Sequence, residues 1–190
     1  MRPLRHALVL TVTAGLALSM FSACGDDVSP AGSSPSAAAS AAGDAPAAEA
    51  FDPCKRITAA EIGAIVGFTV TMKEVPGGGC SYDPADDPRM TTISISAGVP
   101  AASGGGIESS KTGSAALIDG EVTPLSGVGD AAYVVVGKGK VMGKSSFQAQ
   151  SAVEVKGQLV VVTLAQFGAA TKEQVTTFVT EATKLVASKL

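Results

Sequence analysis

The sequence of 190 residues contains one histidine and no tryptophan. The histidine is His6, which precedes the expected signal-peptide cleavage site, so the mature protein has no imidazole. This excludes a Ser-His or Cys-His nucleophile pair, an H-E-x-x-H zinc site and a histidine pH switch. The G-x-S-x-G and S-x-x-K motifs of serine hydrolases are missing as well.

Basic residues are also few. There are 14 Lys and Arg against 17 Asp and Glu, for a net charge of −3. Removal of residues 1–23 takes away Arg2 and Arg5 and no carboxylate, which leaves 12 basic residues and a net charge of −5. The mature protein is therefore mildly acidic. It has no basic, aromatic-rich stretch, and nucleic acid is not expected as a partner.

The amino-terminal residues have the pattern of a lipoprotein signal peptide. Arg2 and Arg5, with no acidic residue near them, precede an apolar stretch over 7–21 and then Cys24. The stretch of about 15 residues is shorter than the roughly 20 that a membrane-spanning helix needs. We therefore expect cleavage before Cys24, a lipid such as palmitate on its thiol, and a location on the extracytoplasmic face of the cell membrane. An uncleaved anchor helix, or an ordinary signal peptide cut elsewhere, is the alternative.

Two further cysteines follow in the exported part of the chain. An oxidising compartment makes a disulfide the default for any pair within reach. If Cys24 carries a lipid, Cys54 and Cys80 remain to pair, and closing a loop of about 27 residues would stabilise the fold by about 3–4 kcal/mol. The alternative is a reactive thiol. It is disfavoured because the sequence has no C-x-x-C motif and no histidine beside either cysteine.

The mature chain divides into a tether and one domain. Residues 24–50 are mostly Ala, Ser, Pro and Gly with no large side chain to bury, and they predict a disordered tether spanning roughly 28 Å on average. Residues 51–190 have the usual size of a single folded domain.

Periodicity predicts helices near both ends of this domain. Thr58 and Glu61 form a capping box for a short helix over 59–66. Thr171 and Gln174 form a second one, for an amphipathic helix at the carboxyl end. A weak helix is expected over 109–117.

Apolar alternation predicts strands between these helices, over 68–73, 80–82, 90–97, 131–136, 147–155 and 159–166. We expect Gly157 at the first central position of a type II′ turn between the last two strands. Tight connections between successive strands favour an antiparallel sheet. The predicted fold is therefore a single two-layer α+β domain, in which the sheet packs against the short N-terminal helix and the C-terminal amphipathic helix.

Neither glycine-rich segment fits a nucleotide site. Residues 139–145 have three residues between the glycines where a phosphate-binding loop needs four, and a strand rather than a helix follows. Residues 127–132 match a loose dinucleotide fingerprint, but the glycines are better explained by a tight turn. No cofactor is expected.

Two clusters of charge are candidates for surface contacts. Lys138, Lys140 and Lys144 lie in one glycine-containing connection, which is either a solvated loop or a contact for anionic lipid headgroups or an acidic wall polymer. Three aspartates fit no calcium-loop spacing, and no metal is expected; they are Asp83, Asp86 and Asp87.

A set of motifs in the domain is similar to a known family. They are an Asp-Pro-Cys-x-x-Ile-Thr segment, a cysteine followed two residues later by an aromatic, and a Gly-x-Gly-Asp-x-Ala turn: residues 52–58, Cys80 with Tyr82, and residues 127–132. The chain resembles a large family of actinobacterial secreted lipoproteins of unknown function. The resemblance implies a lipidated extracytoplasmic domain, a disulfide between Cys54 and Cys80, and no catalytic residues to transfer. Family members often have Trp where this chain has Tyr82.

These observations favour a non-enzymatic, membrane-anchored binding or sensing module of the cell envelope. Its ligand would be another envelope protein, a wall fragment or a small molecule, held in a groove between the sheet and the C-terminal helix. The alternatives are a carrier of lipid or of a small apolar ligand, which needs a large apolar cavity, and a carboxylate-based glycan hydrolase, which needs two facing carboxylates.

Mass spectrometry of the protein isolated from its native membrane tests the expected anchor. The mature amino terminus should be Cys24 carrying acyl chains, because the signal peptidase cuts before the residue that is lipidated. An unmodified terminus, or a chain that still begins at Met1, would contradict the anchor, the tether and the argument that leaves Cys54 to pair with Cys80.

Overall fold

The computed structural model describes residues 49–87, 91–141, 144–166 and 170–190. The expected signal peptide, Cys24 and the expected tether up to residue 48 lie outside these ranges. Within them, none of the helices is long and apolar enough to cross a membrane.

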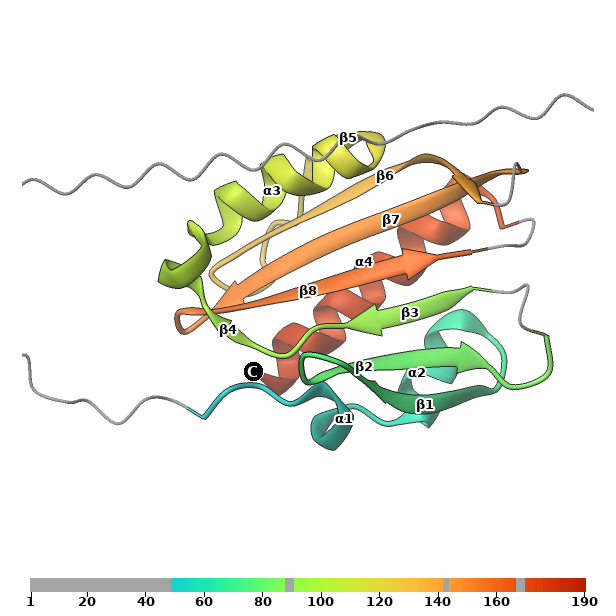
Figure 1. Cartoon of the computed structure of the whole chain (residues 1–190), viewed down its shortest axis with the longest axis horizontal. Coiled ribbons are helices and arrows are strands. Elements are labelled where there is room, and N and C mark those ends of the chain that lie inside the picture. Colours follow the sequence, from blue (N-terminus) through green and yellow to red (C-terminus); the bar gives the residue numbers. More distant parts are fainter. Residues whose placement is uncertain (1–48, 88–90, 142–143, 167–169) are drawn as a thin grey trace, which may run out of the picture. The chain divides into compact units, whose positions relative to one another are not determined.

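The described residues form one antiparallel sheet in the order β1-β2-β3-β8-β7-β6-β5, with β4 also paired to β8 (Figure 1). The last strand along the chain, β8, therefore joins the first three strands to the consecutive strands β5, β6 and β7. The strand bounds are Val70–Val75 (β1), Gly79–Pro84 (β2), Thr92–Ile95 (β3), Val99–Pro100 (β4), Asp119–Pro124 (β5), Ala131–Val141 (β6), Lys144–Val155 (β7) and Gln158–Ala165 (β8).

Helices cover both faces of the sheet (Figure 1). On one face, α4 (Lys172–Lys189) packs across β6, β7 and β8, while α1 (Pro53–Arg56) and α2 (Ala59–Val66) lie beside β1 and β2. On the other face, α3 (Gly106–Leu117) follows the 3-10 turn η1 (Ala101–Gly104) and contacts β5, β6 and β7. The predicted α+β class, with a short helix before the sheet and a long one after it, is confirmed. Helix α3 adds a layer that covers part of the second face.

Alternate side chains of the strands build the two apolar cores. Ile93, Val153 and Leu164 face α4 and are fully buried in the larger core, together with Tyr82. The alternation predicted over 147–155 is confirmed, since Ala149, Ser151 and Val153 lie on one side. The smaller core lies under α3 and consists of Ala101, Ile118, Tyr133, Val135, Ala152 and Leu159.

Each of the two tyrosines is buried, and each fixes one helical segment to the sheet. The Tyr82 hydroxyl lies 3.0 Å from the carbonyl oxygen of Ile57 and 3.2 Å from that of Pro53, at the two ends of α1. The Tyr133 hydroxyl lies 2.6 Å from Oγ of Ser114 on α3. A buried phenol needs a hydrogen-bond partner, so these contacts set where the helices sit on the sheet. Burial also raises the pKa of Tyr82.

A disulfide between Cys54 on α1 and Cys80 on β2 joins the beginning of the domain to the sheet. This is the pairing that the cysteine count and the motif resemblance predict.

Both predicted capping boxes are present. Thr58 and Glu61 bond reciprocally at the start of α2, and Thr171 and Gln174 do the same for α4. Helix α2 ends at Gly67, whose φ of 81° places it in the left-handed region.

The predicted type II′ turn is wrong. Val155 pairs with Gln158, so Lys156 and Gly157 are the central residues, and their φ angles are 49° and 74°. Two successive positive φ values define a type I′ turn, with Gly157 in the second central position. The strand predicted over 131–136 is also longer than expected, because β6 pairs with β7 along its whole length to Val141.

The Glu61 carboxylate links α2 to α4 and gives a pH-dependent contribution to stability. It accepts from Nζ of Lys189 at 2.8 Å and from Thr58 N at 2.9 Å, and these contacts lower its pKa from 4.5 to about 2. Because the folded-state pKa is the lower one, the stabilisation is fully present above about pH 5 and is lost as the pH falls toward 2.

We expect Glu61→Gln to lower the free energy of unfolding by about 1 kcal/mol at pH 7, since the contacts are partly exposed to solvent. The gap between variant and wild type should close between about pH 5 and pH 2, as measured by urea denaturation across that range. Glu181→Gln, which removes an ion pair within α4, is the matched control and should change little. A gap that does not depend on pH would contradict the assignment.

Candidate functional site

The groove expected between the sheet and the C-terminal helix is filled. Val175, Val179, Ala182 and Val186 of α4 are fully buried against the sheet. The polar pair in this layer is also internal, since the hydroxyls of Ser151 and Thr183 bond to each other. No space remains along this contact for the ligand expected there, so candidate sites have to be sought on the surface.

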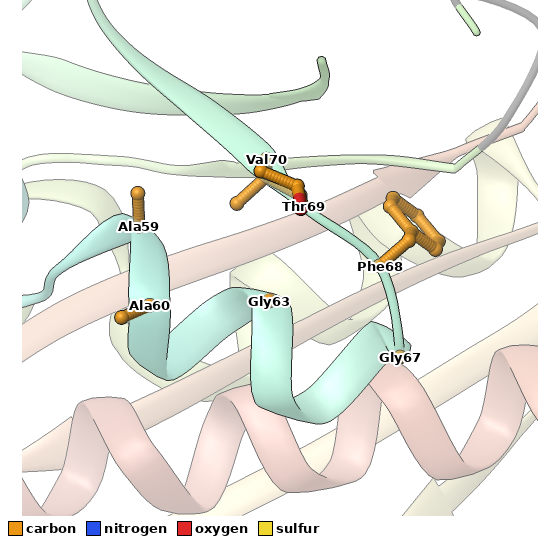
Figure 2. A pocket seen from close by; sticks show the side chains of 7 residues that line it. All are labelled: Ala59, Ala60, Gly63, Gly67, Phe68, Thr69 and Val70. Carbon is orange, nitrogen blue, oxygen red and sulfur yellow. The ribbon is translucent and has the colours of Figure 1, made fainter. Parts of the chain in front are cut away.

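A hollow of about 600 Å³ lies at the surface between α2 and β1. Figure 2 shows α2 along one side and the chain from Gly67 into β1 along the other. Its lining is uncharged and, apart from Phe68, made of small or medium-sized residues: Ala59, Ala60, Gly63, Gly67, Phe68, Thr69 and Val70.

Gly63 holds the two walls of this hollow close together. A Cβ atom at this position would lie 3.0 Å from the carbonyl oxygen of Phe68, so a larger residue would push α2 away from the entry into β1. Val70 is buried beneath the hollow and Phe68 is half-buried at its side. The hollow is therefore shaped by backbone approach and carries little functional chemistry of its own.

Strand β1 borders this hollow and is an edge of the sheet. Within the described ranges it pairs with β2 alone. Met72 faces the helix side, because it lies opposite the buried Tyr82, yet 45% of it is exposed. Lys73 and Glu74 beside it are exposed as well. A strand edge, an apolar side chain and a hollow thus lie together, and the sequence alone did not indicate that 70–75 would form an edge.

A second hollow, of about 440 Å³, lies on the opposite face of the sheet, in the part that α3 leaves uncovered. Ser94, Ser96, Val161 and Thr163 line it together with the turn after β1. Its lining is neutral and it contains no acid or base.

The motif residues that resemble the lipoprotein family have structural roles in a helix cap and a turn. Asp52 caps α1 by accepting from Cys54 N at 3.1 Å, and its contact with Lys55 lowers its pKa. In the turn over 127–132, Asp130 accepts from Lys156 N at 2.7 Å. Gly129 has no room for a side chain, because a Cβ atom would lie 2.6 Å from the Glu154 carbonyl oxygen. These residues fix connections, which explains their spacing without any catalytic role.

The lysines predicted to meet an anionic surface lie on strands rather than in a loop. Lys138 and Lys140 are exposed on β6, with Lys138 Nζ 5.8 Å from the centre of the Phe147 ring, and Lys144 begins β7. The described chain starts at Glu49, which bonds Gln158 at the other end of β7 and β8. Lys138 and Lys140 pair with Phe147 and Ser145 of β7, so the three lysines lie about 27 to 37 Å along the strands from that point.

The aspartates weighed for calcium are dispersed. Asp83 is the next-to-last residue of β2 and accepts from the Ser81 hydroxyl at 3.1 Å, while Asp86 is exposed in the segment that follows. In the part of the chain that the structure describes, no group of three or more His, Cys, Asp or Glu could hold a metal ion.

No family model matches this chain, and no curated protein matches it. Among solved structures, the chain is similar to the crystal structure of LpqN, described as involved in cell envelope biogenesis of Mycobacterium tuberculosis. The match covers 50% of this chain and 68% of that one, with 19% sequence identity and a TM-score of 0.28. A match at this level carries no argument about this chain.

Vesicle co-sedimentation tests the anionic-surface hypothesis for the lysines. If Lys138, Lys140 and Lys144 contact acidic headgroups at about 1 kcal/mol each, replacing all three with Ser should weaken binding to phosphatidylglycerol vesicles at least about tenfold. The compact unit Ala45–Leu190, which lacks the lipid, is the protein to use. Lys172→Ser, on the exposed start of α4, is the control. Equal binding by the triple variant and wild type would remove the hypothesis.

Proposed function

We propose that this protein is a membrane-anchored, non-enzymatic binding module of the cell envelope, and that its ligand is another protein. The observation that carries the proposal is the contrast between a filled interior and an open surface edge. Helix α4 is packed without a groove against β6, β7 and β8, whereas β1 leaves a strand edge and the α2 hollow exposed. Shallow surface features of this kind suit recognition of a protein surface.

The filled core argues against the carrier alternative. A lipid carrier needs an apolar cavity that buries most of its ligand. The place predicted for it, between the sheet and α4, is occupied by side chains that are fully buried. The two hollows described above lie at the surface and are open to solvent.

The electrostatics of the carboxyl groups argue against the glycan hydrolase alternative. A glycosidase acid needs a carboxyl group whose pKa is raised so that it can donate a proton. The pKa values of Asp52, Glu61 and Glu173 are shifted in the opposite direction, by ion pairs or by hydrogen bonds at helix starts. Such carboxylates are suited to capping helices.

The expected attachment point of the tether is far from the α2 hollow, which would leave the hollow exposed. Phe51 is buried, and its N–H donates to Gln158 Oε1 at 2.9 Å, at the start of β8. The hollow lies by the start of β1, where Val70 pairs with Pro84 at the opposite end of the sheet (Figure 1). A domain held by residues 24–50 would present this end away from its attachment point.

Site-specific photo-crosslinking in the lipidated protein tests this function. A crosslinking amino acid at position 60, in the wall of the hollow, should give protein adducts in native membranes, and the same group at Thr123 on the opposite edge should not. Mass spectrometry of the adducts distinguishes the candidates. Lipid adducts at position 60, or lipid bound in equal amount to the purified protein, would support a carrier and overturn the proposal.

A further inference from the structure

The free edge of β1 presents a regular row of backbone hydrogen-bonding groups. Ala85 N donates to the Thr69 carbonyl, and the register with β2 continues from this pair without interruption. Hydrogen-bonded pairs alternate along an antiparallel ladder, so Thr71, Lys73 and Val75 bond to β2. The N–H and C=O groups of Val70, Met72 and Glu74 therefore point outward.

The other edge of the sheet, strand β5, is less suited to pairing with an added strand. Leu125 N donates to the Ala132 carbonyl, so the same alternation turns Gly120, Val122 and Pro124 of β5 outward. Proline has no N–H to donate, and proline on an edge strand is a device that discourages pairing. The two edges thus differ, and β1 is the one with a complete set of donors and acceptors.

The hollow beside β1 lies where alternate side chains of an added strand would project. A new strand would lie about 4.8 Å from β1, with every second side chain on the face of α2. Ala59, Ala60 and Gly63 leave that space open, and Met72 has its exposed side chain on the same face. Small apolar side chains of the added strand fit there.

We propose that an extended segment of a partner protein adds to β1 as an antiparallel strand, in the groove between β1 and α2. The inference rests on the proposed function and names the kind of partner. Its charge pattern follows from two exposed residues. A carboxylate belongs opposite Lys73, where a non-hydrogen-bonded pair brings side chains closest, and a basic side chain belongs opposite Glu74.

Charge matching also favours a partner protein over the two other possible occupants of the β1 edge, which are a second copy of this chain and its own tether. If two copies paired through β1 with Met72 opposite Met72, Lys73 would face Thr71. If the register shifted so that Lys73 lay opposite Lys73, two like charges would face each other. The tether, residues 24–50, contains no Lys or Arg and therefore offers no basic side chain to place opposite Glu74. A partner segment can supply both charges.

The probe is the acetylated and amidated peptide Thr-Lys-Glu-Val-Thr-Val-Thr, which places its Glu opposite Lys73 and its Lys opposite Glu74. We expect saturable binding to the mature chain by isothermal titration calorimetry. At saturation, amide exchange at Val70, Met72 and Glu74 should slow by at least about tenfold, because these are the N–H groups that become paired.

Variants separate the backbone pairing from simple side-chain contact. Met72→Pro removes an outward N–H and should weaken peptide binding at least about tenfold, whereas Met72→Thr keeps the N–H and should stay within about threefold. Lys73→Glu should weaken binding by about two- to fivefold, and a peptide with Lys in place of its Glu should restore it. Circular dichroism and thermal unfolding establish that each variant is folded.

Three results would overturn the proposal. The first is absence of binding, or binding without protection of the outward amides. The second is a dimer by light scattering whose amides at Val70 and Met72 are already protected. The third is binding of the peptide by the unit Ala45–Leu190 and not by the mature chain, which would mean that the tether itself occupies the β1 edge. If crosslinking at position 60 still captures a protein in any of these cases, the proposed function stands and only strand addition fails.

Discussion

Strand β8 pairs with β3 on one side and with β7 on the other, and this double pairing holds the domain together. Without it, β1 to β3 and β5 to β7 would be two separate sheets. Val160, Val162 and Leu164 of β8 point at α4 and are fully buried, so the helix packs on the strand that joins the two halves. Gln158, at the start of the same strand, accepts a hydrogen bond from Phe51 N near the beginning of the described domain.

The first residues of the domain are tied down by several different interactions. Phe51 is buried, Cys54 is bonded covalently to β2, and the hydroxyl of Tyr82 reaches the backbone at both ends of α1. A short helix of this kind has little stability by itself. The disulfide and the buried phenol explain why the Asp-Pro-Cys segment and the aromatic after Cys80 occur together, since both belong to one structural junction.

The proposed function depends on which parts of the sheet are buried in the cores and which are left exposed. Alternate strand residues are used for two cores, one under α4 and one under α3, so little apolar surface remains within the sheet. What remains is at the margin, where α2 lines the hollow with Ala59, Ala60 and Gly63 and β1 has no second neighbour in the described structure. The recognition proposed at this margin would depend on backbone groups and shape.

Local patterns in the sequence determined the class of fold, the two capping boxes, the alternation over 147–155 and the pairing expected for Cys54 and Cys80, because each depends on residues close in sequence or on a count. The order of the strands, the short strand β5 and the position of α3 were decided by long-range pairing, which leaves no periodic signal in a segment such as Asp119–Pro124. The candidate site at the β1 edge could not be predicted from the sequence for the same reason. Whether residues 70–75 form a central strand or an edge strand depends on which distant strand lies beside them. The sequence determined the local elements and the chemistry that the chain lacks, while only the tertiary structure decided which backbone groups were left unpaired.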